Sequence, residues 1–314
     1  MKAVSVKKTT GVPKRSLQKL LKNYGLLYAM FIPVALYFII FCYVPMFGVV
    51  IAFQDYNPMY GFLHSQWVGL QNFVDFFSNY YFFRLLKNTL VISASSIVFG
   101  FPMPIIFALL LNEIKNNAFK RSIQTVSYIP HFISMVVICG MIRTFTADNG
   151  IITMLLSALG LAEKTSLLNN PSAFVPIYII SDIWQSIGWD SIIYLAALSN
   201  IDQSLYEAAS IDGANRMQQT IHVTLPEIGR TVIILFILRL GSVLGVGYEK
   251  IILLYNPLTY ETADVISSFV YRKGLQEMDW SYSTAVGLFN SIVNFALLVF
   301  TNWFSGKVTD TSLW

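Results

Sequence analysis

The sequence predicts an all-α membrane protein with about six transmembrane helices and both termini in the cytoplasm. Of its 314 residues, 55% are hydrophobic and only 12% are charged, which is about half the charge of a typical soluble domain. Several runs without Lys, Arg, Asp or Glu exceed the ~20 helical residues that cross a hydrocarbon core. Continuous apolar runs of this length favour helices over the alternating pattern of a membrane β-barrel.

The predicted spans fall into two groups according to charge. Four are free of charged residues, namely 23–54, 88–112, 122–142 and 280–306. Two carry isolated charges, namely 174–199 with Asp182 and Asp190, and 231–254 with Arg239, Glu249 and Lys250. The first run is too long for the core of a signal peptide, so we expect it to remain as the first span.

The distribution of basic residues predicts the orientation. With six spans, both termini and the second and fourth connections share one side, and that side holds 13 of the 21 Lys and Arg residues. The positive-inside rule therefore places both termini and the connection around Glu207 in the cytoplasm. The basic N-terminus is suited to anionic lipid headgroups, and the net charge of +4 requires no nucleic acid partner.

Two of the connections predicted to face outward have features of their own. The connection 55–84 is rich in aromatic residues, which is typical of an aromatic belt at the membrane interface, although a docking surface for an external partner is an alternative. The connection 147–173 contains 151–161, which we expect to form a short interfacial helix.

A polar segment, 206–228, stands out within this hydrophobic chain and reads YEAASIDGANRMQQTIHVTLPEI. The Ala-rich stretch 205–210 favours a helix, and Gly213 fits a left-handed turn or C-cap. A second helical stretch follows, and Pro226 ends it or opens the next element. Two short helices meeting at a glycine form a compact knob on which small alanines permit close approach and Glu207 offers one charge. An ordinary amphipathic connector between two spans is the alternative.

The spacing within this segment resembles the cytoplasmic EAA loop of the membrane subunits of bacterial ABC importers. In that loop an Ile usually stands where this chain has Val223. The resemblance implies that this loop contacts an ATPase subunit. It rests on Glu207, Ala208, Ala209, Asp212, Gly213, Val223, Leu225 and Pro226.

The resemblance extends beyond the loop, because spans two to six look like the five-helix core of type I ABC importer permeases. The segments 24–27, 52–56 and 247–250 are similar to the branch that carries complex or oligomeric sugars. The implied layout is a cytoplasmic N-terminus at 1–25, a first span at 26–53, an external loop at 54–84, a permease core at 85–304 that includes a coupling loop at 200–228, and a cytoplasmic tail at 305–314.

This resemblance implies a permease subunit that imports an oligosaccharide or polysaccharide fragment across the bacterial cytoplasmic membrane. The implied partners are a second homologous permease subunit, two ATPase subunits, an extracytoplasmic solute-binding protein and membrane lipid. ATP and Mg would be bound by the ATPase chains. We expect no cofactor, metal or nucleic acid on this chain.

Motifs of catalysis are missing from the sequence. It contains no G-x-x-x-x-G-K-[ST] stretch to hold nucleotide phosphates, no nucleophile elbow and no metal-ligand spacing among its three histidines. The glycine cluster 241–247 lies within an apolar span, where glycines more often permit close helix packing. We therefore expect a transport subunit and not an enzyme.

Polar residues inside the predicted spans are candidates for the transport path. They are Trp184, Gln185, Trp189 and Asp190 in span four and Arg239 in span five. Because an unpaired charge at the membrane centre costs at least ~2.5 kcal/mol, and the two charges have similar predicted depths, Asp190 and Arg239 could form a salt bridge. Such a pair either locks two helices together or faces a wet cavity in which indoles and polar groups bind a sugar.

Two other functions remain open from the sequence. The same fold could import another solute, such as a peptide or an ion. A secondary carrier or channel would need no ATPase, but it would then have no use for a cytoplasmic docking knob.

Overall fold

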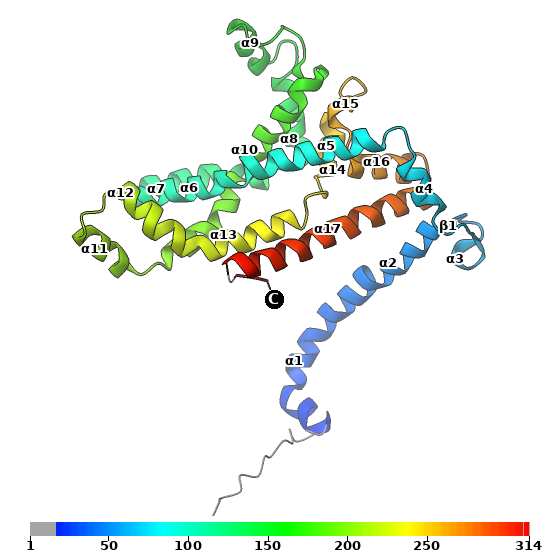
Figure 1. Ribbon diagram of the computed structural model, residues 1–314, viewed down its shortest axis with the longest axis horizontal. Coiled ribbons are helices and arrows are strands. Elements are labelled where there is room, and N and C mark those ends of the chain that lie inside the picture. Colours follow the sequence, from blue (N-terminus) through cyan, green and yellow to red (C-terminus); the bar gives the residue numbers. More distant parts are fainter. Residues whose placement is uncertain (1–16, 310, 314) are drawn as a thin grey trace, which may run out of the picture. The chain divides into compact units, whose positions relative to one another are not determined.

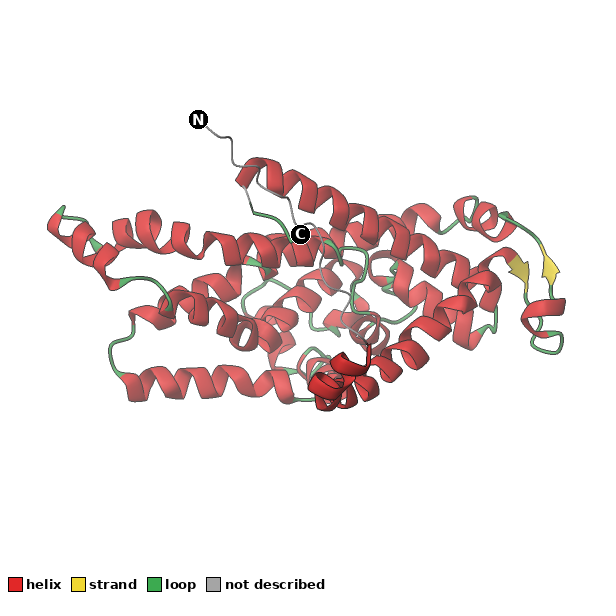
Figure 2. Cartoon of the chain, turned by 90° about the horizontal axis from the view of Figure 1, so that it is seen from below, coloured by secondary structure: helices red, strands yellow, loops and turns green. Residues whose placement is uncertain are grey.

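The computed structural model describes residues 17–309 and 311–313, and it is almost entirely helical (Figures 1 and 2). The chain divides into two compact units, 1–50 and 51–314. Four helices are long and apolar enough to cross a membrane, or five if one bent pair counts as a single span. The predicted basic segment before Leu17 lies outside the described residues.

The first unit contains most of the first candidate span, Tyr24–Phe53, which confirms a helix at this position. It is built from α1 (Leu17–Phe38), a π-turn (Ile39–Tyr43), α2 (Val44–Met46) and the start of a 3-10 segment (Phe47–Phe53). None of the side chains in its most apolar window is buried.

The aromatic connection after the first span forms a small hairpin at the start of the second unit. Strands β1 (Gln54–Asp55) and β2 (Gln66–Trp67) pair antiparallel, with Gln54 opposite Trp67. The rings of Phe53 and Trp67 stack at 5.9 Å, and the Tyr56 N–H donates to Ser281 Oγ at 2.8 Å. The hairpin is therefore fastened to the last long helix. Its neighbouring helices are α3 (Gly61–His64) and α4 (Gln71–Phe77).

The second candidate span, Phe82–Glu113, agrees with the prediction. It comprises α5 (Phe82–Ser95), a π-turn (Ser96–Gly100) and α6 (Pro102–Glu113). Prolines 102 and 104 interrupt the regular helical bonds because they lack an N–H. The π-turn just before them accommodates this, since the Phe101 N–H reaches Ser96 O at 3.1 Å.

The prediction of one continuous span over 122–142 is wrong, because the chain bends by 99° within it. One arm is α7 (Asn117–Tyr128) with a 3-10 turn (Ile129–Phe132), and the other is α8 (Met135–Phe145). Pro130 cannot continue the hydrogen-bond ladder, and the Ser134 hydroxyl caps a new helix by accepting from the Val137 N–H. The expected short helix in the next connection is present as α9 (Ile151–Ala158).

Helix α10 (Pro171–Ser199) has 29 residues and corresponds to the predicted fourth span. At 1.5 Å per residue it is about 43 Å long, enough to cross a bilayer. It is not among the four helices that are both long and apolar enough, and it carries Asp182 and Asp190. It packs against α6, and Gly188 lets it approach α7 closely.

Substitution of Gly188 should destabilise the fold, because an added Cβ would lie 2.2 Å from the backbone oxygen of Ser127. We expect Gly188→Ala to cost ~1–3 kcal/mol through overpacking, measured by thermal unfolding in detergent. Gly287→Ala in the last long helix is the matched control, since no heavy atom outside the helix backbone lies within 4 Å of its added Cβ. Equal unfolding temperatures for the two variants would refute the close crossing.

The prediction of a continuous fifth span over 231–254 is also wrong. The candidate span is Arg216–Leu240, and the chain then leaves helical structure until α14 (Tyr248–Leu254) begins. The helices that precede the break are α11 (Gln203–Ile211), α12 (Arg216–Gln219), a π-turn (Thr220–Thr224) and α13 (Leu225–Leu240). The Leu244 N–H donates to Asn294 Oδ1 at 2.9 Å, so side chains satisfy backbone groups that the lost helix would have paired.

The C-terminal part closes the bundle. Helix α17 (Trp280–Thr309) confirms the predicted sixth span and packs beside α13, where Gly241 lies against Leu298. Between α14 and α17 lie α15 (Tyr260–Ala263), α16 (Ile266–Tyr271) and a π-turn (Arg272–Gln276). Helices α5, α6, α13 and α17 share one general direction, with α11 and α12 at one end (Figure 1).

Candidate coupling loop and transport cavity

The glycine turn predicted between the two short helices is present. Gly213 has a φ of +79°, and it follows α11 directly after Asp212. The Gly213 N–H bonds to Ser210 O at 3.1 Å, and the Ala214 N–H bonds to Ala209 O at 2.9 Å. These two bonds form a Schellman motif, which ends a helix with a left-handed residue.

Both short helices also have capped N-termini. The Asp202 carboxylate accepts a hydrogen bond from the Ser204 N–H at 2.9 Å. Hydrogen bonds from the backbone and side chain of Ser204 lower the pKa of Asp202. Asn215 and Gln218 form a reciprocal capping box at the start of α12. The loop is therefore a defined pair of helices whose geometry is set by its own sequence.

Side-chain contacts fasten the helix pair to the bundle. The hydroxyls of Tyr206 and Thr224 lie 3.0 Å apart and join α11 to the π-turn before α13. Arg216 and Glu113, at the end of α6, form an ion pair at 2.7 Å. Tyr206 also packs against an apolar cluster centred on Tyr194, Leu198 and Ile228. A force on this loop would consequently reach α6, α10 and α13 together.

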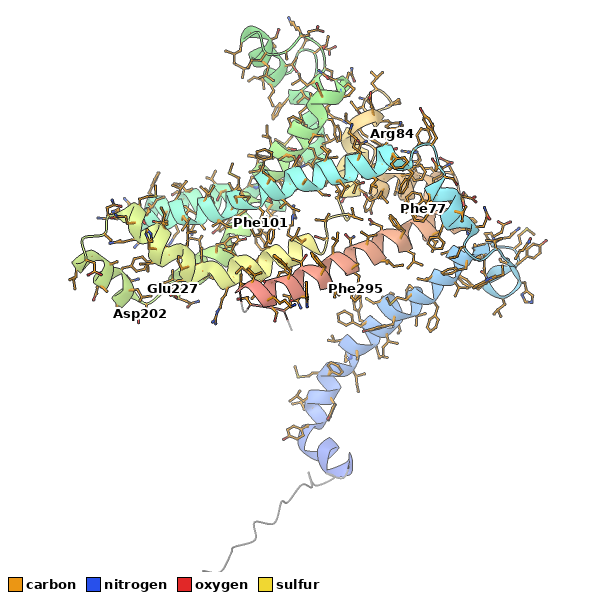
Figure 3. The ribbon with its side chains drawn as sticks, in the orientation of Figure 1. Phe77, Arg84, Phe101, Asp202, Glu227 and Phe295 are labelled. Carbon is orange, nitrogen blue, oxygen red and sulfur yellow. The ribbon has the colours of Figure 1, made fainter. Side chains whose placement is uncertain are left out.

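The predicted coupling residues lie mostly on the surface. Glu207, Ala208, Asp212, Gly213, Leu225 and Pro226 are exposed, and Ala209 and Val223 are half-buried. Asp202, just before α11, and Glu227, in the first turn of α13, lie toward the same end of the bundle (Figure 3). Pro226 opens α13 without ending the helix that precedes it.

The predicted salt bridge between Asp190 and Arg239 is absent from the ion pairs among described residues, so this interpretation is wrong. Arg239 lies in the last turn of α13, directly before the helix breaks, and it lines the cavity at that break, which Asp190 does not line.

A different ion pair joins α10 to α14. Lys250 Nζ, at the start of α14, lies 3.4 Å from Asp182 Oδ1 in α10. It also donates to the backbone oxygen of Tyr178 at 3.2 Å and lies over the Tyr178 ring. Lys250 is 2% exposed, so this pair anchors α14 beyond the helix break.

The other candidate path residues lie in separate surroundings. Trp184 lines a cavity of about 960 Å³ between α8, α9 and the start of α10. The Trp189 ring stacks on His131 at 4.5 Å between centroids, while Gln185 is half-buried in α10. Arg239 lines a smaller cavity at the break between α13 and α14. The structure thus does not gather the five residues into one site.

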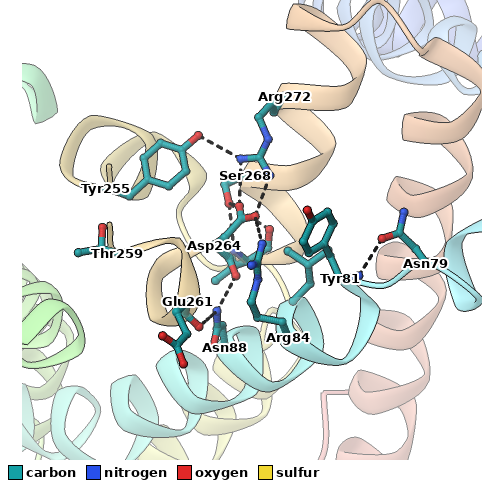
Figure 4. Close-up of polar contacts among 12 residues, drawn as sticks. Asn79, Tyr81, Arg84, Asn88, Tyr255, Thr259, Glu261, Asp264, Ser268 and Arg272 are labelled. Carbon is teal, nitrogen blue, oxygen red and sulfur yellow. Dashed lines mark hydrogen bonds and ion pairs between the residues drawn. The ribbon is translucent and has the colours of Figure 1, made fainter. Parts of the chain in front are cut away.

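The structure contains a buried network of ion pairs and hydrogen bonds that the sequence does not predict. Asp264 is fully buried and pairs with Arg272 at 2.7 Å and with Arg84 at 3.5 Å. The Ser268 hydroxyl donates to the same carboxylate at 2.8 Å, and the Asn88 amide donates to the Asp264 carbonyl at 3.0 Å. The network ties the segment between α14 and α16 to α5 (Figure 4).

The Asp264 carboxylate stabilises the charged form of Arg272. Burial lowers the pKa of the Arg272 guanidinium, but hydrogen bonds to Asp264 and the charge of that carboxylate outweigh burial and raise the pKa above its usual value. Arg84 lies at the opposite end of the bundle from Asp202 and Glu227 (Figure 3). The charged network therefore fixes the end remote from the candidate coupling loop.

A helical membrane bundle with a capped, exposed loop at one end and a polar cavity at a broken helix is the architecture of a transport permease. Residues 100–310 match the family described as binding-protein-dependent transport system inner membrane component. The chain belongs to this family. It is a multi-pass permease subunit of an ABC importer in the inner membrane, and not an enzyme.

Curated relatives from Bacillus subtilis (strain 168) match almost the whole chain. Protein LplB is 45% identical over 93% of this chain and 92% of its own length. The polygalacturonan/rhamnogalacturonan transport system permease protein YteP is 44% identical over 96% of this chain and 94% of its own length.

Solved structures share the fold. The chain is 44% identical to a chain of a bacterial ABC transporter involved in the import of the acidic polysaccharide alginate, with a TM-score of 0.85, covering 93% of this chain and 99% of that one. A structure of the bacterial alginate ABC transporter in complex with an alginate pentasaccharide-bound periplasmic protein gives a TM-score of 0.86 at 44% identity, covering 95% and 99%.

Proposed function

We propose that this permease imports an oligosaccharide or polysaccharide fragment and takes its driving force from separate ATPase chains. ATP and Mg would be bound by those chains. The observation that supports this proposal best is the capped helix pair between Glu207 and Pro226, which is exposed and joined to three long helices. It has the shape and position of a docking knob.

The mechanism follows from how the loop is held. Closure of two ATPase subunits would move the helix pair as one body, because the Schellman turn and the capping box keep its two helices in a fixed relation. The contacts of Tyr206 and Arg216 would transmit this movement to α13 and α6. The bundle would then switch between inward-facing and outward-facing packings, which are discrete arrangements.

The proposed topology has six spans, with both termini and the coupling loop 200–228 in the cytoplasm. The bent pair α7–α8 and the long helix α10 would supply two of these spans. The remaining parts are the cytoplasmic N-terminus 1–25, the external loop 54–84 and the tail 305–314, and the core is 85–304. The positive-inside distribution of Lys and Arg supports this orientation.

The proposed partners are a second homologous permease, two ATPase subunits, an extracytoplasmic solute-binding protein and membrane lipid. The alginate transporter, of similar fold, has been solved with a periplasmic protein, which supports a binding protein here. The substrate proposal has comparable support, since YteP is named for polygalacturonan and rhamnogalacturonan transport and the solved transporter imports the acidic polysaccharide alginate.

Cysteine accessibility tests both the orientation and the docking role. Single cysteines at Ser210 and Lys307, in a background without Cys42 and Cys139, should react only with a reagent on the cytoplasmic side, and one at Glu163 only from outside. The cysteine at position 210 should also cross-link to the co-expressed ATPase subunit, whereas that at 307 is the control for random collision. Labelling of position 210 from outside would overturn the proposal.

A further inference from the structure

A polar cavity of about 330 Å³ lies where α13 ends and α14 begins. Its wall is drawn from α5, α10, α13, the glycine-rich break and α14. Small-molecule sites span about 300–1,000 Å³, so this cavity has room for a short part of a polymer. Unwound backbone between half-helices is a recurrent setting for substrate sites in transporters.

Four charged residues line the cavity, and their pairing is unequal. Lys250 is neutralised by Asp182 at 3.4 Å and held by the Tyr178 carbonyl. Arg239 takes part in no ion pair among the described residues, and its guanidinium donates no hydrogen bond within them. Glu249 lies in the first turn of α14, where the helix dipole favours a negative charge.

Hydroxyl groups complete the lining and suit a sugar. Ser93, Ser96 and Ser242 come from α5, its π-turn and the break. Ser93 donates to the Val243 carbonyl and Ser242 to the Arg239 carbonyl at 3.0 Å, which leaves their oxygens able to accept from ligand hydroxyls. The Glu249 carboxylate can accept further hydrogen bonds from sugar hydroxyls.

We propose that this cavity is a subsite for an anionic, uronate-type sugar unit, in which the Arg239 guanidinium binds the sugar carboxylate. The inference rests on the proposed function and adds a charge selection to it. A guanidinium and a carboxylate match as two parallel hydrogen bonds. An ionisable side chain without a partner inside a membrane protein marks a functional site, and Arg239 has no ion-pair partner among the described residues.

Paired probes test this charge selection directly. Trigalacturonate and its fully methyl-esterified form differ in charge but keep the same rings and hydroxyls. Binding of each labelled probe would be measured by equilibrium dialysis with the complete permease–ATPase complex in nanodiscs, without the binding protein. We expect the wild type to prefer the acid, and Arg239→Gln to weaken acid binding by roughly ten- to a hundredfold while ester binding changes less than about twofold.

Two further variants separate recognition from structure. Arg239→Lys should recover part of the acid binding, because it restores the charge without the planar fork. Arg230→Gln removes an exposed arginine from the same helix outside the cavity and should bind both probes as the wild type does. Equal loss of acid and ester in Arg239→Gln, or unchanged acid binding, would overturn the inference.

Uptake by whole cells distinguishes this inference from the proposed function. If cells import trigalacturonate but the complex does not bind it, the subsite is refuted and the importer assignment stands. If cells import neither trigalacturonate nor its ester but take up a neutral oligosaccharide, the subsite is refuted and the proposed function stands. If they take up none of the three, the proposed function is refuted as well.

Discussion

Replacing Asp264 by Ala should lower the free energy of unfolding by about 3–5 kcal/mol, the usual cost of removing one partner from a buried ion pair. The carboxylate is fully buried between Arg84 and Arg272, so its loss leaves two guanidiniums without their shared counterion. Thermal unfolding of the detergent-solubilised permease would measure the effect. Asp264→Asn should be milder, because the amide oxygen can still accept from Ser268.

A surface ion pair in the same region provides the control. Lys273 and Glu277 are four residues apart and partly exposed, and such pairs contribute only ~0–1 kcal/mol. Glu277→Ala should therefore unfold close to the wild type. If Asp264→Ala proves as stable as Glu277→Ala, the buried network does not hold the segment between α14 and α16 to α5. Should the Ala variant fail to express, the Asn variant carries the same comparison.

The sequence could not have paired Asp264 with its two arginines. Arg84 stands 180 residues earlier, and neither charge lies in a periodic pattern that indicates a partner. Hydropathy locates helices along the chain, but it does not show which polar ends meet. For the same reason, the glycine turn between two short helices can be predicted from the sequence, whereas the contacts of this candidate coupling loop with Glu113 and Thr224 cannot.

Sequence patterns do not show which acidic residue pairs with which basic residue inside the membrane. Asp182 and Asp190 are eight residues apart, which separates them by about 80° around α10 and about 12 Å along it. Lys250 lay near the predicted end of span five, and Arg239 within it. Only the structure, in which the helix breaks after Leu240 and α14 begins at Tyr248, shows that Lys250 meets Asp182.

Each of the two interrupted spans contains residues that indicate the break, although the hydropathy of the whole run is that of a single span. Pro130 followed by Ser134 is a stop and a new N-cap, and the structure bends at that point. The glycines between 241 and 247 were interpreted as packing residues. Gly241 does lie against Leu298, yet the segment also leaves the helix, because glycine costs ~0.5–1 kcal/mol relative to alanine in a helix interior. The glycines of this segment therefore permit close packing and also favour the end of the helix.

Gly213→Val should abolish substrate-stimulated ATP hydrolysis in the reconstituted importer while the permease still inserts and assembles. At a φ of +79° a β-branched residue is strained by ~1–3 kcal/mol. No heavy atom lies within 4 Å of an added Cβ, so the penalty comes from the backbone and not from a clash. The turn would relax, and α11 would lose its fixed angle to α12. ATP hydrolysis and uptake would be measured on the same vesicles.

Gly213→Asn is the matched control, because asparagine tolerates left-handed conformations far better than valine. It should retain most of the coupling although it adds a side chain at the same exposed position. Glu207→Lys tests contact instead of geometry, since it reverses an exposed charge and leaves the Schellman turn intact, and it should also uncouple hydrolysis from uptake. If valine and asparagine at 213 behave alike, the left-handed turn does not matter for coupling. Full uptake by both Gly213→Val and Glu207→Lys would remove the loop from the mechanism.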